Sequence, residues 1–330
     1  MKRLLASVAM IGATLLAMSP ERPVLAQETI VTISGAGPQG RWFKEASLVG
    51  KLLSEKMDGV EVNGVIGKGV SVGNIKRIMA GRIEAGRGFL PDLVLAYDNA
   101  PPFDDGRDYS NVVSWITVNP LIYRLIGDAD IESYSDLEGK TVAIGGRNSG
   151  DDARAKEILA AHGITDENAD LVYLARSDAQ NALIDRQIDA LLISYSRNNR
   201  GHLGPVFAAR DLDDDIDFID MDEEKAKEIV ANNPAFYVDR LGEPVFDHPD
   251  LVGLAVRTGF MISKDVPEDI VYEMTKAIFE NWDEVTESAP WWKEKGAAGP
   301  DIAASFTAAP YHPGAQKYYE EAGIWQEHRE

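Results

Sequence analysis

The stretch that decides the fold reads TVAIGGRNSG at residues 141–150, and DDARAKEILAAHG follows it at 151–163. The apolar start predicts a strand over 141–145, and the glycines predict a sharp turn into a helix that ends near Gly163. Short apolar segments at 172–174 and 190–193 predict two further strands. A β-α-β-α-β series of this kind is typical of parallel strands covered by helices.

The same alternation of strand and helix patterns occurs before this stretch, and a strand and a helix follow it. The predicted elements are a strand at 30–34, a helix at 43–57, a strand at 60–66, a short helix near 74–80, strands at 112–118, 121–126 and 253–262, and a helix at 266–286. Because the pattern occurs twice and the last elements can return to the first unit, we expect an α/β protein with two lobes. The predicted limits are 27–118 plus 250–330 for lobe I and 119–249 for lobe II.

The first residues predict export from the cytoplasm. Lys2 and Arg3 precede an uncharged apolar run at 4–18, and Val24-Leu25-Ala26 offers small or apolar residues for a signal peptidase. The run is shorter than the roughly 20 residues that a membrane-spanning helix needs. We therefore expect a cleaved signal peptide at 1–26 and a mature protein in the periplasm.

Charge and composition exclude several classes of function. The chain of 330 residues has 33 basic and 54 acidic side chains, a net charge of −21, so a nucleic-acid partner is not expected. It has no cysteine, which excludes disulfides, thiol catalysis and cysteine-ligated metals. The five histidines lack metal-ligand spacing and no Gly-x-Ser-x-Gly motif occurs, so we predict no metal and no catalytic residues. We expect a monomer.

Two glycine-rich loops match nucleotide-binding sequence motifs only in part. Residues 35–40 read GAGPQG, the G-x-G-x-x-G pattern of dinucleotide-binding proteins, but the next strand ends VIGK rather than in Asp or Glu. Residues 145–150 begin like a phosphate-binding loop, but Asp151 and Asp152 stand where Lys and Ser or Thr are required. We therefore expect no cofactor and no enzymatic activity, with a nicotinamide or flavin enzyme as the weakest alternative.

These loops nevertheless have the properties of anion-binding sites. Glycine permits a close approach of the backbone, and the free N–H groups at a helix N-terminus favour a negative charge. A third loop at 67–71, GKGVS, has the same character and adds the cation Lys68. For each loop, the alternative that the glycines only serve a tight turn stays open.

Several longer motifs resemble the TAXI-type solute receptors of tripartite ATP-independent periplasmic (TRAP) transporters. The opening loop with Trp42 and Phe43 is similar to that family's start, and 69–74 is similar to its Gly-Ser-x-x-Asn stretch with Val70 inserted. The segment VPEDIVYEMTKAIFEN at 266–281 resembles the family's Leu-Pro-Glu-Asp-Val-Val-Tyr helix, and YHPGAQKYY at 311–319 resembles its His-Pro-Gly-Ala-x-x-Tyr-Tyr signature.

The resemblance implies a type II periplasmic binding protein fold, with two α/β lobes that close on a ligand cleft. It also implies delivery of the ligand to TRAP membrane subunits, driven by an ion gradient. Family ligands are small organic anions, including acidic amino acids such as glutamate and carboxylates such as 2-oxoglutarate. An extracytoplasmic sensor that serves a signalling partner is the alternative function.

The departures from the family lie in the candidate site. Residues 147–151 read RNSGD where the family has Pro-Gly-Ser-Gly-Thr, so the identity of the ligand does not carry over. Asp92 and Asp151 have two open roles, either binding an ammonium group or capping a helix. The other candidate ligand-binding residues are cations (Lys68, Arg147, Arg197), hydrogen-bonding side chains (Ser71, Asn74, Asn148, Ser149), the loop residues Gly37, Gln39, Gly40 and Gly150, and aromatic walls (Trp42, Phe43, Tyr195).

Overall fold

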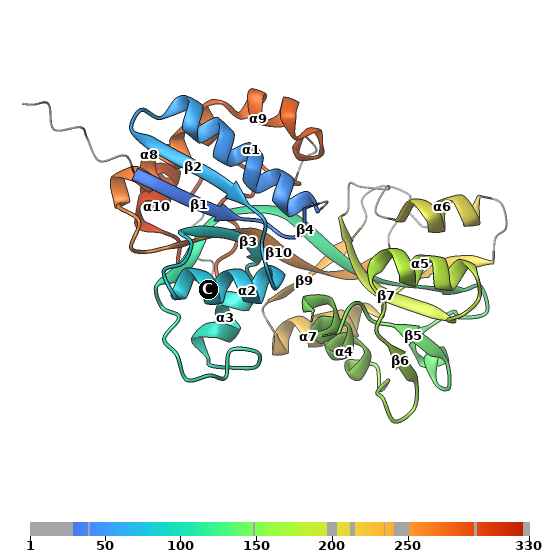
Figure 1. Cartoon of the computed structure of the whole chain (residues 1–330). Coiled ribbons are helices and arrows are strands. Elements are labelled where there is room, and N and C mark those ends of the chain that lie inside the picture. Colours follow the sequence, from blue (N-terminus) through green and yellow to red (C-terminus); the bar gives the residue numbers. More distant parts are fainter. Residues whose placement is uncertain are drawn as a thin grey trace, which may run out of the picture.

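Two groups of helices and strands are joined by two long strands, β4 (Val112–Asp128) and β10 (Val252–Ser263) (Figure 1). We name these groups the first lobe and the second lobe. The structure is a computed structural model. It describes residues 29–38, 40–147, 149–196, 203–211, 215–233, 235–240, 251–293 and 296–325. The predicted signal peptide at 1–26 lies outside the described residues.

The first lobe contains the elements from both ends of the described chain. They are β1 (Thr29–Ser34), α1 (Arg41–Lys56), β2 (Val60–Val65), α2 (Val70–Met79), β3 (Ala85–Phe89), α3 (Pro91–Tyr97), α8 (Glu268–Glu280), α9 (Trp282–Ser288), the 3-10 turn Pro290–Trp292 and α10 (Pro313–Glu321).

The second lobe contains the central part of the chain. Its elements are the 3-10 turn Tyr134–Leu137, β5 (Thr141–Ala143), α4 (Gly150–Ala161), β6 (Asp170–Val172), α5 (Arg176–Ile184), β7 (Ala190–Ser196), α6 (Gly204–Arg210), β8 (Ile216–Ile219), α7 (Glu223–Asn232) and β9 (Phe236–Arg240).

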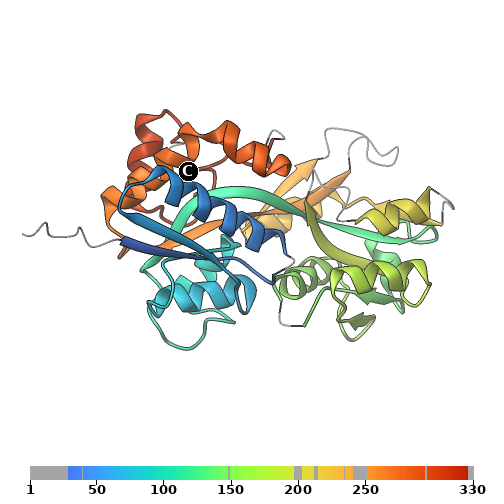
Figure 2. The ribbon, with the colours of Figure 1, turned by 45° about the horizontal axis from the view of Figure 1, so that its top comes forward.

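The described strands form one mixed sheet of ten strands, whereas the β-α-β patterns alone predicted parallel strands. Its main order is β2-β1-β3-β10-β4-β7-β5-β6, with β8 beside β4 and β9 beside β10. Within each lobe the strands pair in parallel, β1 with β2 and β3, and β5 with β6 and β7. The long strands β4 and β10 run antiparallel to each other and to their other neighbours, so the sheet continues from one lobe into the other (Figure 2).

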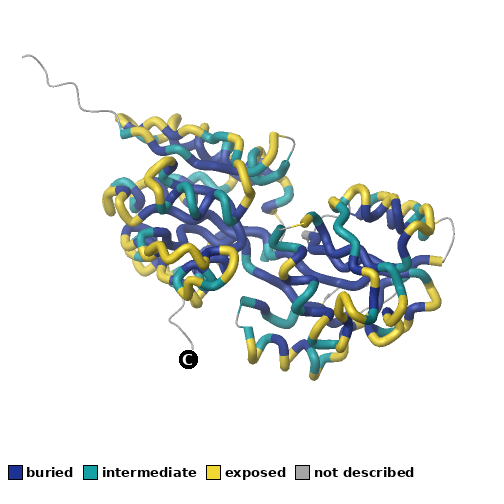
Figure 3. The backbone as a smooth tube through the Cα atoms, turned by 60° about the horizontal axis from the view of Figure 1, so that its bottom comes forward, coloured by how far each residue is buried: buried dark blue, intermediate teal, exposed yellow. Residues whose placement is uncertain are grey.

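The apolar cores follow this division. One buried cluster includes Ile33 of β1, Leu53 of α1 and Met274 of α8, and lies in the first lobe. Two further clusters lie on opposite faces of the second-lobe sheet, one under α4 and α7 and the other under α5 and α6. The strands are accordingly the buried interior of the molecule, and the outer faces of the helices are exposed (Figure 3).

The two strands predicted at 112–118 and 121–126 are a single strand, β4. Asn119 and Pro120, which lie between the two predicted ranges, form a bulge, since two residues of β4 lie opposite Arg257 between the pairs Val118–Thr258 and Leu121–Val256. Asn119 has a φ of +48°, which asparagine tolerates better than most residues. The bulge therefore bends a continuous strand at the passage between the lobes.

The helix predicted at 266–286 is two helices, α8 and α9, with a break at Asn281. The side chain of Asn281 donates a hydrogen bond to the carbonyl of Ala277 at 2.8 Å. Such a local bond competes with the helical backbone bonds, which explains why the helix ends here. No helix within the described ranges has the length and apolar character that a membrane span requires.

Candidate ligand-binding cleft

A cleft of about 460 Å³ lies where the two lobes meet. Its walls come from the starts of helices, from the ends of strands and from β4. The lining residues are Ala36, Gly40, Arg41, Trp42, Gly69, Val70, Ser71, Val72, Phe89, Asp92, Asn119, Leu121, Arg147, Ser149, Gly150, Asp151, Arg176 and Ser194.

Among the described helices of nine or more residues, four begin at this cleft: α1, α2, α4 and α5. In α4, the side chain of Ser149 accepts a hydrogen bond from the backbone N–H of Asp152. The first turns of α1, α2 and α5 have no side-chain cap bond. Free backbone N–H groups and the positive ends of the helix dipoles therefore meet at one place, which is favourable for an anion.

The second-lobe wall carries a hydrogen-bonded polar cluster. The hydroxyl of Tyr123 donates to Oδ1 of Asp151 at 2.8 Å, and Oδ2 of Asp151 lies 3.8 Å from Nη2 of Arg176. That nitrogen also donates to Oγ of Ser194 at 3.3 Å, while Nε of Arg176 is buried without a hydrogen-bond partner. Burial, and then the carboxylate of Asp151, raises the pKa of Tyr123 well above its ordinary value, so Tyr123 stays a donor. Arg176 lines the cleft, so its guanidinium places a positive charge there.

Arg147 supplies a second guanidinium on the same wall. It is exposed, and its guanidinium carbon lies 3.8 Å from the centre of the Tyr173 ring. Stacking of this kind orients a guanidinium without using its N–H donors. Arg147 and Arg176 together make this wall the cationic side of the cleft.

The first-lobe wall is mainly apolar. The rings of Trp42 and Phe89 meet edge to face, with centroids 5.4 Å apart and planes at 71°. Val70 and Val72 at the start of α2 extend this wall, and Leu121 of β4 closes it.

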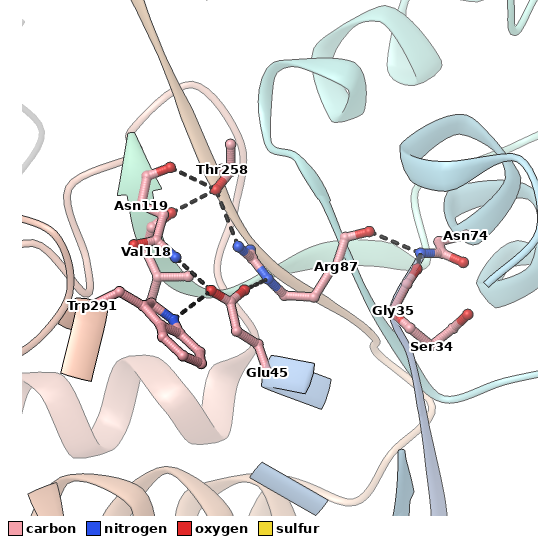
Figure 4. A network of polar contacts seen from close by, with 9 residues as sticks. All are labelled: Ser34, Gly35, Glu45, Asn74, Arg87, Val118, Asn119, Thr258 and Trp291. Carbon is pink, nitrogen blue, oxygen red and sulfur yellow. Dashed lines mark hydrogen bonds and ion pairs between the residues drawn. The ribbon is translucent and has the colours of Figure 1, made fainter. Parts of the chain in front are cut away.

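A network of buried polar side chains in the first lobe supports this wall (Figure 4). Glu45 of α1 is fully buried, and its carboxylate accepts from Nε of Arg87 at 2.7 Å, from Nδ2 of Asn119 at 2.6 Å and from Nε1 of Trp291 at 3.1 Å. Arg87 also donates to the hydroxyl of Thr258. Since a buried carboxylate is stable only when it is paired and hydrogen-bonded, the network fixes α1, β3 and β4 relative to each other.

An ion pair connects the two lobes beside the cleft. Asp92 of α3 and Arg154 of α4 are both buried, and Oδ1 of Asp92 lies 2.6 Å from Nη2 of Arg154. The guanidinium of Arg154 also lies 4.4 Å from the Phe89 ring centre and donates to the carbonyl of Gly150 at 3.1 Å. A second hollow of about 310 Å³ lies on the other side of this pair. The cleft is therefore bounded on this side by a direct contact between the lobes.

Eight of the sixteen predicted ligand-binding residues line the cleft. These are Gly40, Trp42, Ser71, Asp92, Arg147, Ser149, Gly150 and Asp151. Three others, Gln39, Asn148 and Arg197, lie outside the described residues. The remaining five, which are Gly37, Phe43, Lys68, Asn74 and Tyr195, do not line it.

Their surroundings explain the difference for Asn74 and Tyr195. Asn74 is fully buried, and its amide nitrogen donates to the carbonyls of Gly35 at 2.8 Å and Arg87 at 2.9 Å (Figure 4). It therefore holds the loop after β1 against β3. Tyr195 is buried in the second-lobe core beside Phe218, with ring centroids 6.2 Å apart. Lys68 is exposed outside the cleft.

The sequence analysis missed Arg176, Ser194, Phe89 and Asn119. Arg176 begins α5, directly after the strand predicted at 172–174, and Asp178 provides an acidic first turn. That helix-start signal was available in the sequence. Asp92 and Asp151 both lie in the first turn of a helix and both have a cationic neighbour, Arg154 and Arg176 respectively. No group of three His, Asp or Glu suited to a metal ion is found among the described residues.

The fold is that of periplasmic solute-binding proteins. XAC2383 of Xanthomonas citri, in a structure bound to ATP, is 10% identical at a TM-score of 0.55, covering 90% of this chain and 97% of that one. A binding protein component of an ABC phosphonate transporter from Pseudomonas aeruginosa is 12% identical at a TM-score of 0.50, covering 80% of each chain. The sulfonate-binding protein SsuA of Methylobacillus flagellatus is 18% identical at 0.48, covering 82% and 71%. At these identities the likeness concerns the fold.

A family model gives the assignment of the chain itself. The model of the NMT1-like family matches residues 33–323, which include both lobes and every residue that lines the cleft. The chain therefore belongs to the NMT1-like family.

Proposed function

We propose that this protein is a solute-binding receptor that captures a small organic anion in the cleft between its lobes. The observation that carries the proposal is the meeting of four described helix starts with Arg147 and Arg176 at one cleft. Helix N-termini and guanidinium groups both stabilise negative charge, and arginine can hold a carboxylate through two hydrogen bonds. The arrangement supports binding and offers no nucleophile with an adjacent base among its lining residues.

The lobes at 27–118 plus 250–330 and at 119–249 then act as the two jaws of the receptor. A ligand held by groups from both jaws favours the closed arrangement, because closure adds contacts that the open form lacks. Asp92 and Arg154 are such a pair of contacting groups, one on each jaw.

We further propose that the receptor is exported by its signal peptide at 1–26, acts in the periplasm and delivers its ligand to TRAP membrane subunits. The support for TRAP subunits is the resemblance of 266–281 and 311–319 to TAXI-type receptors. The phosphonate-binding structural neighbour belongs to an ABC transporter, which uses a different kind of membrane partner. A neighbouring gene for a fused TRAP permease would support the proposal, whereas genes for an ATPase subunit or a sensor kinase would contradict it.

The experiment that tests the receptor is a thermal-shift screen of the mature protein against organic acids, amino acids and sulfonates. A ligand that binds only the folded state raises the melting temperature, and at 100 times its Kd it contributes about 2.7 kcal/mol. We expect a shift with an anion that is lost in Arg147→Ala and retained in Arg186→Ala, an exposed arginine that pairs with Asp215 outside the cleft. A screen in which neutral or cationic solutes alone shift the melting temperature would contradict the proposal.

A further inference from the structure

The two walls of the cleft suit different parts of a ligand, because one wall is charged and polar and the other is mainly apolar. The second-lobe wall presents Arg147, Asp151, Arg176 and Ser194. The first-lobe wall presents mainly the apolar side chains of Trp42, Val70, Val72 and Phe89, together with Ala36. A ligand that touches both walls therefore needs an anionic end and an apolar body.

Three polar side chains of the first-lobe wall have hydrogen-bond or ion-pair partners within the protein. Oγ of Ser71 accepts from the backbone N–H of Phe89 at 2.9 Å, Asn119 donates to Glu45, and Asp92 is paired with Arg154. The guanidinium of Arg41 lies 5.4 Å from the centre of the Trp291 ring. Ser71, Asn119 and Asp92 therefore each have a partner within the protein, and the apolar side chains supply most of the remaining surface of this wall.

Val70 is the most informative residue of that wall. Its φ is +48°, in the left-handed region, where a β-branched side chain is strained. Val70 also lines the cleft and is 46% exposed. Both the backbone strain and the exposure favour another residue, such as glycine, at this position. A contact with an apolar part of the ligand is a physical reason for a valine here.

The volume of the cleft also favours a ligand with an apolar part. Its volume of about 460 Å³ lies within the range of pockets that enclose small organic molecules, roughly 300–1,000 Å³. An anion of two or three carbons would leave most of the apolar wall in contact with water. An aryl or branched-alkyl group would cover it and gain the free energy of apolar burial.

We propose that the ligand is a carboxylate with an apolar body of aryl or branched-alkyl type, and that Val70 selects for this body. The inference rests on the proposed function and makes its ligand more specific. The carboxylate lies toward Arg147, Arg176 and the start of α4, and the body lies between Val70, Trp42 and Phe89. This orientation separates such ligands from acids whose whole length is polar, including glutamate and 2-oxoglutarate.

The test is calorimetric titration of the mature protein with matched acids of equal charge. The pairs are 3-phenylpropanoate against propanoate and phenylsuccinate against succinate, with glutamate and 2-oxoglutarate added. We expect the aryl member of at least one pair to bind about tenfold or more tightly than its partner, the range in which apolar pockets distinguish ligands. Val70→Gly should remove most of that difference.

A matched control is Ile30→Ala, since Ile30 is another exposed large apolar residue but lies outside the cleft. It should leave both affinities unchanged. Tighter binding of glutamate, 2-oxoglutarate or the unsubstituted acids, with no effect of Val70→Gly, would overturn this inference and leave the anion receptor intact. Absence of binding by every acid would overturn the anion receptor, and this inference with it.

Discussion

Oδ1 of Asp92 lies 2.6 Å from Nη2 of Arg154, and this pair joins α3 of the first lobe to α4 of the second. The side chains are only 4% and 7% exposed. Burial, the largest single effect, lowers the pKa of Arg154, but the charge and hydrogen bond of Asp92, together with the charges of Tyr123 and Asp151, raise it above its ordinary value. Opening the cleft would return both charges to water, so the contact contributes only to the closed arrangement.

Asp92→Asn should therefore accelerate ligand release. The variant leaves the guanidinium of Arg154 buried without an opposite charge, and truncating one partner of such a pair costs about 2 kcal/mol or more, mostly in the dissociation rate. We expect roughly thirtyfold faster release, measured by stopped-flow fluorescence of Trp42 at the cleft. Asp130→Asn is the control, because Asp130 is exposed and accepts from Lys140 away from the cleft. An unchanged dissociation rate in Asp92→Asn would show that the pair does not hold the closed form.

Gly150→Ala should hinder closure by a steric effect. A Cβ at Gly150 would lie 2.7 Å from Nη1 of Arg154 and 2.8 Å from Cε2 of Phe89, which belongs to the opposite lobe. Overpacking of this kind costs about 1–3 kcal/mol. Small-angle scattering should show a ligand-bound variant with a larger radius of gyration than the bound wild type. Gly146→Ala, which has open space around its Cβ position, should close normally, and equal compaction of both variants would contradict the account.

Val70→Gly should raise the stability of the ligand-free protein. A left-handed backbone costs an L-residue about 1–2 kcal/mol, whereas glycine adopts it freely but loses about 0.5–1 kcal/mol more entropy on folding. We expect the free energy of unfolding in urea to increase by about 0.5–1 kcal/mol. Val72→Gly, on the same helix but outside the positive-φ residues, should instead be destabilising. Equal losses in both variants would show that Val70 is not strained.

His312 should make the protein less stable in mild acid. It is buried at the start of α10, where Nδ1 accepts from the N–H of Gly314 at 3.2 Å and Nε2 donates to the carbonyl of Val266 at 3.0 Å. The neutral ring alone satisfies both bonds, and burial lowers the pKa of His312. As the pH falls below the ordinary pKa of about 6.5, the unfolded chain takes up the proton more readily than the folded one. The free energy of unfolding therefore decreases in this range.

His312→Asn keeps a capping side chain and removes the titrating group. Urea unfolding between pH 7.5 and pH 5.5 should show a smaller loss of stability for this variant than for the wild type. Part of the loss should persist, because burial also lowers the pKa of His162. An identical pH dependence in both proteins would exclude His312 as a source.

The order of elements was largely predictable, because strands and helices alternate with clear apolar periodicity. β1, α1, β2 and α4 lie close to their predicted ranges. The joining of the two lobes by one mixed sheet was not predictable from local patterns, since β10 pairs with β3 and β4 across more than a hundred residues of chain. The bulge at Asn119 shows the same limitation, because an Asn-Pro pair has the local signature of a turn.

The site residues that lie at the starts of helices could be predicted from the sequence. The glycine-rich loops led to Gly40, Ser71, Ser149 and Gly150, which line the cleft. Asn74 belongs to the same loops, but its amide is used by backbone carbonyls, and a sequence does not distinguish such a structural amide from one that binds a ligand. The cluster of Tyr123, Asp151, Arg176 and Ser194 forms only through folding, because its members come from four separate elements.

The most direct test of the account is a crystal structure of the mature protein with the carboxylate that gives the largest thermal shift. The account predicts that the carboxylate lies against the start of α4, within hydrogen-bonding distance of Arg147 or Arg176, with the rest of the ligand toward Trp42 and Val70. A ligand bound outside the cleft, or one bound in the cleft with its carboxylate remote from both arginines and from the four helix starts, would contradict it.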